Sequence, residues 1–103
     1  MVQIATNTNF EDIITGPNPV LVDMWAVWCG PCRMLSPTVD DIAAEHPEFT
    51  VVKCNVDDCD DIALRFGIRS IPTLLFFKDG QLAEKTVGLV SKQEIETILN
   101  NLL

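Results

Sequence analysis

The sequence predicts an α/β domain with a central five-stranded mixed sheet flanked by four helices. Short apolar runs alternate with stretches in which apolar residues recur every three or four positions, as in strands separated by helices. The last two apolar runs flank Asp79-Gly80, a hairpin signal that predicts an antiparallel pair. The earlier strands are separated by helical stretches and are expected to be parallel.

Length and composition fit one globular domain over residues 1–103. The chain has 48% hydrophobic and 21% charged residues, which separates it from disordered proteins. Its net charge is −8 and it has no basic stripe, which argues against nucleic acid and anionic membranes as partners. We find no signal peptide at the start and no apolar run of membrane-spanning length. We therefore expect a cytoplasmic protein.

The first elements are a short strand, a helix and a long buried strand. Residues Val2–Ala5 predict the first strand. Thr8 and Glu11 have the spacing of a capping box, which predicts a helix that ends at Gly16-Pro17. The nearly continuous apolar run Val20–Ala26 predicts a strand buried on both faces.

A long helix is predicted from Pro31 to Glu45. Pro31 suits its first turn, where the missing N–H is no loss, whereas Pro37 is expected to kink the helix. His46-Pro47 ends it, and Phe49–Val56 predicts the next strand.

The C-terminal part begins with an acidic turn over residues 57–61 and a short helix that Gly67 ends. Thr73–Phe77 and Leu82–Val87 predict the hairpin strands. Ser91 begins a second capping box and the final helix. The inward positions of that helix are Ile95, Ile98, Leu99 and Leu102.

Cys29 and Cys32 lie where the buried strand meets the long helix. Unpaired N–H groups and the helix dipole at that point stabilise an anion, here the Cys29 thiolate. Cys32 follows about one turn later, within reach of Cys29. Cys29 would attack a disulfide in a partner, and Cys32 would resolve the mixed disulfide. The pair therefore predicts a thiol–disulfide oxidoreductase.

Two other uses of this cysteine pair are weaker. A zinc site normally needs four ligands, and the remaining candidates are Cys54, Cys59, His46 and carboxylates, so we predict no metal. A structural disulfide across so short a loop would stabilise the fold little.

The stretch Trp28-Cys29-Gly30-Pro31-Cys32 matches the active-site motif of the thioredoxin family residue for residue. The similarity continues through Val22–Ala26 and Gly67–Thr73. This resemblance implies the thioredoxin fold and an electron carrier that reduces protein disulfides. We expect a monomer, because nothing in the sequence indicates an oligomer. The resemblance also implies recharging by a thioredoxin reductase. NADPH and FAD belong to that partner, so no cofactor is expected on this chain.

Asp23 is an anomaly in the buried strand, because an unpaired buried carboxylate is costly. The residues leave two alternatives: a strand-edge side chain facing solvent, or a buried acid/base that exchanges a proton with Cys32. In the resemblance, Asp23 matches the family's buried aspartate and Lys53 the lysine near it.

The resemblance also implies a contact surface for substrates around the dithiol. Pro72 would be a cis-proline facing the dithiol, whereas the sequence alone favours an ordinary trans strand start. Gly88 is expected to allow close backbone approach. The residues implied for this surface are Trp28, Gly30, Pro31, Ile71, Pro72 and Gly88.

The remaining candidates favour structural roles. Cys54 is expected to act as a small buried hydrophobe, with a regulatory Cys54–Cys59 disulfide as the alternative. His46 is expected to be structural. Two other functions use the same fold: a non-catalytic interaction module, and an oxidase or isomerase. The intact dithiol argues against the first, and Gly30-Pro31 between the cysteines favours a reductant over the second.

Overall fold

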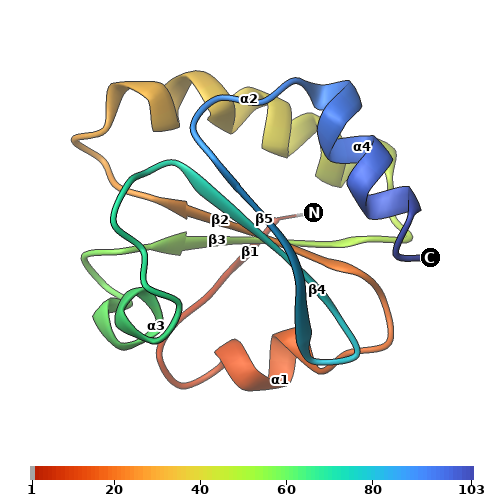
Figure 1. Cartoon of the computed structure of the whole chain (residues 1–103), viewed down its shortest axis with the longest axis horizontal. Coiled ribbons are helices and arrows are strands. Elements are labelled where there is room, and N and C mark those ends of the chain that lie inside the picture. Colours follow the sequence, from red (N-terminus) through yellow and green to blue (C-terminus); the bar gives the residue numbers. More distant parts are fainter. Residues whose placement is uncertain (1) are drawn as a thin grey trace.

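The strands form one five-stranded mixed sheet, as the sequence predicted, and the structure gives their order across it as β1-β3-β2-β4-β5 (Figure 1). The pairs β1–β3 and β2–β3 are parallel, and β2–β4 and β4–β5 are antiparallel. The computed structural model describes residues 2–103. Its elements are β1 (Gln3–Ile4), α1 (Phe10–Ile14), β2 (Val20–Trp25), α2 (Gly30–Glu45), β3 (Thr50–Asn55), α3 (Asp60–Arg65), β4 (Thr73–Lys78), β5 (Gln81–Val87) and α4 (Lys92–Asn100).

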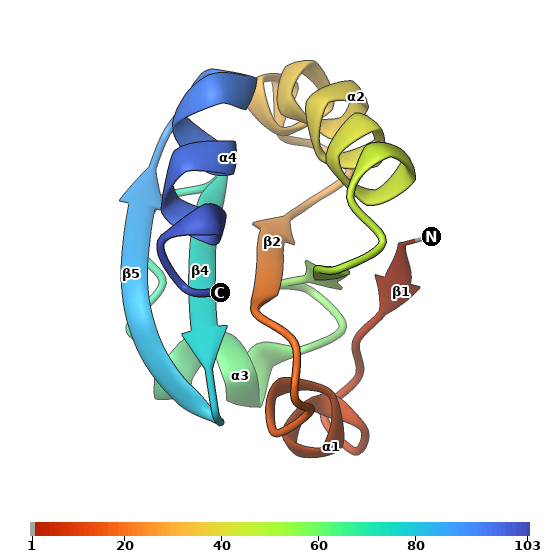
Figure 2. The same cartoon turned by 90° about the vertical axis from the view of Figure 1, so that its right-hand side faces the viewer.

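Helices cover both faces of the sheet. α2 and α4 lie on one face, and α1 and α3 lie on the other (Figure 2). Because side chains alternate along a strand, β2 sends Leu21 toward α2 and α4 and Val22 toward α1 and α3. The same alternation places Asp23 on the face that α2 covers. In the described part of the chain, no helix is long and apolar enough to cross a membrane.

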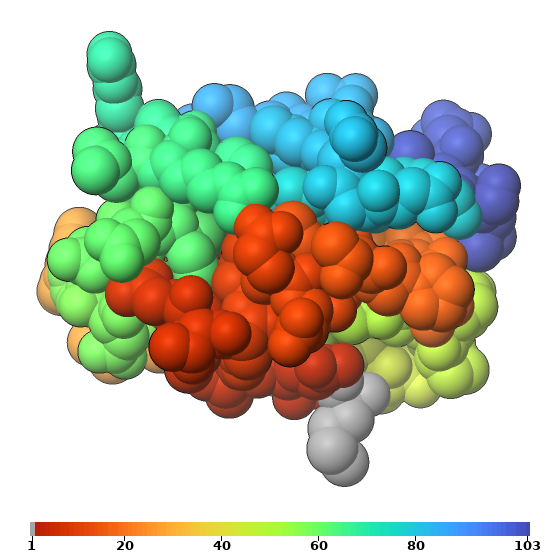
Figure 3. Space-filling model, turned by 90° about the horizontal axis from the view of Figure 1, so that it is seen from below, coloured from red at the N-terminus to blue at the C-terminus, as the bar shows by residue number. Residues whose placement is uncertain are grey.

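Residues of α1 and α3 cover one face of the sheet, which is seen from below in Figure 3, and aromatic rings pack beneath them. The Phe77 ring lies 5.8 Å from that of Phe10 and 5.4 Å from that of Phe66. Arg65 forms an ion pair with Glu11 and stacks over Phe66, which connects α3 to α1 at the surface. All three rings belong to or pack against one buried cluster, so this face is an apolar core.

Two expectations at the N-terminus differ from the structure. The first strand is shorter than Val2–Ala5, because the regular pairing with β3 covers Gln3 and Ile4, although the Ala5 N–H still donates to the Lys53 carbonyl at 2.9 Å. The predicted capping box at Thr8 is wrong: Asn9 is the N-cap of α1, and its side chain makes no cap hydrogen bond. The Asn9 side chain instead accepts a hydrogen bond from the Thr6 N–H, at 2.7 Å, so it stabilises the preceding turn.

The later signals are confirmed more closely. Asp79 and Gly80 connect β4 to β5 with φ values of 54° and 77°, as a tight hairpin turn requires. Ser91 caps α4 by accepting a hydrogen bond from the Glu94 N–H at 3.1 Å. Gly67 follows α3 with a φ of 63°. Helix α2 continues through Pro37 and ends before His46, its C-cap.

Candidate redox site

Cys29 is the N-cap of α2, the position that the sequence predicted for it. Its backbone is extended, with a φ of −94° and a ψ of 110°, and its Sγ accepts a hydrogen bond from the Cys32 N–H at 3.2 Å. That N–H is one of the donors that a helix leaves unpaired at its start. The first turn of α2 therefore supplies a hydrogen bond and a favourable dipole to the Cys29 sulfur.

Cys29 and Cys32 form a disulfide, with their Cα atoms 5.3 Å apart. The structure is thus the oxidised form of the pair. Cys29 is 5% exposed and Cys32 is 2% exposed, so the first sulfur is the more accessible one. Trp25, Val56 and Ile71 pack against the two cysteines. Helix geometry therefore holds the sulfurs within bonding distance, with apolar side chains around them.

The segment before β4 lies against the dithiol. The Ile71–Pro72 peptide bond is cis, and the Ile71 carbonyl oxygen lies 3.7 Å from the Cys29 Sγ. The Gly88 N–H donates to the Pro72 carbonyl at 2.8 Å. Gly88 has a φ of 90°, and a side chain built there would meet nothing within 4 Å. Its positive φ therefore explains the glycine, and the close approach of a partner backbone at this position stays a prediction.

Exposed apolar side chains flank this junction. Trp28 is 68% exposed, and its indole Nε1 donates a hydrogen bond to the Asp57 carboxylate at 2.9 Å. Val27 and Leu89 are also largely exposed. Asp57 was not identified from the sequence, where it belonged to a run of acidic residues with no evident partner. Its bond fixes a large aromatic side chain beside Cys29.

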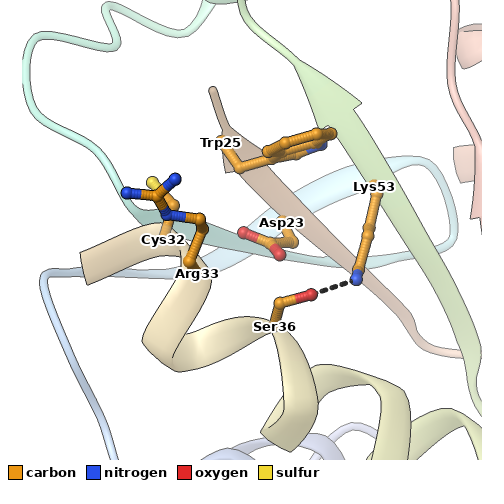
Figure 4. A pocket seen from close by; sticks show the side chains of 6 residues that line it. All are labelled: Asp23, Trp25, Cys32, Arg33, Ser36 and Lys53. Carbon is orange, nitrogen blue, oxygen red and sulfur yellow. Dashed lines mark hydrogen bonds between the residues drawn. The ribbon is translucent and has the colours of Figure 1, made fainter. Parts of the chain in front are cut away.

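A cavity of about 70 Å³ lies behind the dithiol, between β2, β3 and α2 (Figure 4). This volume is enough to admit water. The Asp23 carboxyl lies in it and is 1% exposed, so the solvent-facing alternative for this residue is wrong. The residues that line the cavity are Asp23, Trp25, Cys32, Arg33, Ser36 and Lys53.

Asp23 has an unusual electrostatic environment. Within residues 2–103 its Oδ1 has no hydrogen-bond partner from the protein. Burial raises the pKa of the Asp23 carboxyl to about 6, while the Lys53 charge lowers it and the Asp40 charge raises it. A carboxyl with a pKa of about 6 is able to accept and release a proton near neutral pH.

Lys53 does not pair with Asp23 directly. Its Nζ donates to the Ser36 hydroxyl at 2.5 Å and lies 3.0 Å from the Asp40 carboxylate, and Asp23 is outside ion-pair distance. Sequence reasoning missed Ser36 and Asp40. Cys32, Ser36 and Asp40 are spaced four residues apart, so they share one face of α2, and that spacing was a usable signal.

The other two cysteines are free thiols, fully buried under α1 and α3. The Cys59 thiol donates a hydrogen bond to the Ala5 carbonyl at 3.3 Å. Burial, followed by the neighbouring Cys59 thiol, raises the pKa of the Cys54 thiol. Cys54 is thus the small buried hydrophobe that we expected, and the Cys54–Cys59 disulfide is not formed in this structure.

One group of potential metal ligands is found within residues 2–103. Glu45, His46 and Glu96 have ligand atoms within 4.8 Å of one another, at the C-terminal end of α2. Both Glu45 oxygens accept hydrogen bonds from Lys92, at 2.6 and 2.7 Å. The His46 ring contacts Glu96 and Glu48, at 2.7 and 3.1 Å. These contacts connect α2 to α4, which is the structural role expected for His46.

Comparison with known proteins agrees with this geometry. The sequence profile of the family described as Thioredoxin matches residues 1–101. The chain belongs to the thioredoxin family. Its Cys29–Cys32 pair at disulfide distance is that of a thiol–disulfide oxidoreductase.

Several thioredoxins align with nearly the whole chain. Thioredoxin from Porphyra purpurea is 50% identical over 98 residues, which is 93% of this chain and 92% of that protein. Thioredoxin from Alicyclobacillus acidocaldarius is 44% identical and covers 95% of this chain and 94% of its own length. The solved structure of a mutant thioredoxin from Halobacterium salinarum matches with a TM-score of 0.92 and 32% identity, over 98% of this chain and 89% of that one.

Proposed function

We propose that this thioredoxin reduces disulfides in proteins, with Cys29 as the nucleophile and Cys32 as the resolving thiol. The observation that carries the assignment is the Cys32 N–H bonded to the Cys29 sulfur at the start of α2. This donor favours the anionic form of Cys29 over that of Cys32, because only Cys29 lies at the N-cap. Cys29 is also the more exposed of the two.

The reaction proceeds by two exchanges. The Cys29 thiolate attacks one sulfur of the substrate disulfide, forms a mixed disulfide and releases the other substrate sulfur as a thiolate. Cys32 gives its proton to Asp23, and its thiolate attacks the Cys29 sulfur. The Cys29–Cys32 disulfide forms, and the second substrate sulfur leaves as a thiolate. Two electrons pass from the dithiol to the substrate.

Asp23 is proposed as the proton acceptor for the second exchange. It shares the cavity with Cys32, and its pKa of about 6 lies near working pH. After resolution the proton leaves through the cavity, whose volume admits water. Lys53, on the opposite wall of the cavity, tunes the charge on Asp23.

Substrate binding is proposed for the surface beside Cys29. An extended segment of the partner would hydrogen-bond to the backbone next to Pro72, in the manner of an added strand. Trp28, with its ring fixed through Asp57, and the backbone at Gly30, Pro31, Ile71 and Gly88 would contact the segment. Backbone recognition suits a protein that reduces many different disulfides.

We propose a thioredoxin reductase as the electron donor. That enzyme would carry the FAD and use the NADPH, so this chain itself needs no cofactor. The proposed site of action is a reducing compartment such as the cytoplasm. The two free thiols and the reductive chemistry support it, because disulfides persist mainly in oxidising compartments.

Reduction of insulin disulfides with NADPH and a thioredoxin reductase tests this function. The wild-type chain should accelerate NADPH oxidation, whereas Cys29→Ser should reduce it to the background rate. Cys32→Ser should accumulate substrates bound to Cys29 as mixed disulfides, which mass spectrometry would identify. If the wild-type chain supported no reduction in this assay, the proposal would be wrong.

A further inference from the structure

The positive charge of Lys53 lowers the pKa of Asp23, and two residues of α2 hold the Lys53 side chain in place. The Lys53 side chain is 15% exposed, and its Nζ is held at 2.5 Å from the Ser36 Oγ and 3.0 Å from the Asp40 Oδ1. Figure 4 shows the Ser36 hydroxyl hydrogen-bonded to the Lys53 ammonium, with the Asp23 carboxyl nearby and bonded to neither of them.

The Asp23 carboxyl forms no ion pair with Lys53. Its Oδ1 has no hydrogen-bond partner from the described residues, although Lys53 lies opposite Asp23 in the pairing of β2 with β3. An ammonium with a flexible stem and a buried carboxylate on adjacent strands would normally form a pair. Ser36 and Asp40 therefore compete with Asp23 for the same charge.

We propose that Ser36 and Asp40 are positioning residues, which hold the Lys53 ammonium away from Asp23 and so set the pH range in which Asp23 accepts the Cys32 proton. The proposal deepens the proposed function and rests on it for its kinetic consequence. Its structural part, the position of Lys53, is independent of that function.

The competing contacts act in a defined direction. An opposite charge brought within about 4–6 Å of a carboxylate lowers its pKa by about 1–3 units. When Lys53 is held on Ser36 and Asp40, only part of this effect reaches Asp23, and burial dominates. If Lys53 were released, it would move toward Asp23 and favour the carboxylate, so Asp23 would give up its proton at lower pH.

Other charged or titratable groups near Asp23 are few. From α2 these are Cys32, Arg33 and Asp40, and from β3 they are Lys53 and, on the opposite face, Cys54. The strand on the other side contributes the apolar Leu74. Arg33 is exposed and Cys54 is a thiol with a raised pKa, so Lys53 and Asp40 are the charges whose placement decides the state of Asp23.

The experiment measures the titration of the Asp23 carboxyl by ¹³C NMR in the oxidised protein, together with the pH profile of mixed-disulfide resolution. Ser36→Ala should lower the Asp23 midpoint by about half a unit or more, because Lys53 is released. Asp40→Asn should lower it as well. In each variant the acid limb of the kinetic profile should shift to lower pH by as much as the Asp23 midpoint does, and the plateau rate should be retained.

A Lys53→Met background separates positioning from other effects. There, Ser36→Ala should leave the Asp23 midpoint unchanged, since no ammonium remains to be released. Ser36→Thr, which keeps the hydroxyl, should restore the wild-type midpoint in the otherwise native chain. Asp41→Asn is the matched charge control, because Asp41 is an exposed neighbour on the same helix and should leave the midpoint unchanged.

Two results would overturn the proposal. One is an unchanged or raised Asp23 midpoint in Ser36→Ala. The other is an equal shift with and without Lys53, which would assign the effect to the cavity rather than to the ammonium. Failure of the proposed function is distinguishable, because the NMR titration requires no turnover.

Discussion

Two cysteines of the molecule occupy the same local position, at a helix N-cap, in different chemical environments. Cys29 is the N-cap of α2, and Cys59 is the N-cap of α3. The Cys29 sulfur accepts a hydrogen bond from the Cys32 N–H, whereas the Cys59 thiol donates a hydrogen bond to the Ala5 carbonyl. Cys29 is 5% exposed and Cys59 is 0% exposed. The first environment favours a thiolate with access to a partner, and the second holds a buried thiol that acts as a hydrogen-bond donor.

The difference shows that a helix N-terminus alone does not make a cysteine reactive. A cysteine at this position becomes reactive when its sulfur accepts a hydrogen bond and is accessible to solvent, and it stays inert when its thiol is a buried donor. The two sheet faces differ in the same way. The face under α2 contains a cavity with a carboxyl and an ammonium, and the face under α1 and α3 has close aromatic packing.

The largest expected effect separates the two N-cap cysteines directly. Cys29→Ser should abolish insulin reduction, because serine forms no mixed disulfide at this site. Cys59→Ser, a matched change at the other N-cap, should leave the turnover rate unchanged, because its hydroxyl can still donate to the Ala5 carbonyl. Steady-state assays on both variants provide the comparison. Loss of activity in Cys59→Ser without loss of folding would refute the division of roles.

The aromatic packing under α1 and α3 should account for much of the stability. Phe77→Ala removes a ring that packs on Phe10 and Phe66, and it should lower the free energy of unfolding by about 3–5 kcal/mol. Urea denaturation measures this change. Leu82→Ala on the exposed strand β5 is the control and should change stability by about 0.5 kcal/mol or less. Similar losses in the two variants would contradict the structural role given to this face.

A substitution on the face that α2 covers should raise the stability rather than lower it. The pKa of Asp23 is raised from 3.8 to about 6, so the folded state binds a proton more tightly than the unfolded state. Stability is therefore lost as pH rises through this window, and the loss is complete above it. Asp23→Asn should stabilise the protein by about 2–3 kcal/mol at pH 8 and by much less at pH 4.

The same variant should slow the resolution of mixed disulfides, since asparagine accepts no proton from Cys32. Urea denaturation at the two pH values and rapid-quench kinetics measure the two effects. Unchanged stability at pH 8, combined with unchanged kinetics, would remove both roles from Asp23.

The smallest effect concerns the connection between α2 and α4. Hydrogen bonds to Glu96 and then to Glu48 raise the pKa of His46 above its ordinary value of 6.5. The stabilisation is fully present below that value and is lost as pH rises through the folded pKa. His46→Gln should therefore destabilise the protein more at pH 5.5 than at pH 9, as measured by urea denaturation. A loss independent of pH would indicate that packing on Phe49, not charge, is the main contribution.

Sequence reasoning was most reliable where local chemistry decides the structure. The Asp79-Gly80 turn, the Ser91 cap and the position of Cys29 at the start of α2 depend on a few neighbouring residues. It was less reliable where neighbouring side chains compete for the same backbone groups, and least reliable where distant segments meet. Thr8 fits a capping box, but Thr6 and Asn9 form a turn that displaces it.

The site shows the same limit. The dithiol and the buried carboxyl were identified from the sequence, because each is an anomaly in its own element. The partners of Lys53 were not, because Ser36 and Asp40 are ordinary residues of a helix until β3 is placed against them. Nor could the sequence place Cys59 under the Ala5 carbonyl, which depends on how β1 leads into α1.

The central claim is that the start of α2 makes the Cys29 thiol more acidic than an ordinary cysteine. Absorbance of the thiolate at 240 nm, followed against pH in the Cys32→Ser variant, measures this directly. The account predicts a first midpoint well below about 8.5, the value of free cysteine, whereas burial raises the pKa of the Cys54 thiol above that value. A Cys29 midpoint at or above the free value would contradict it.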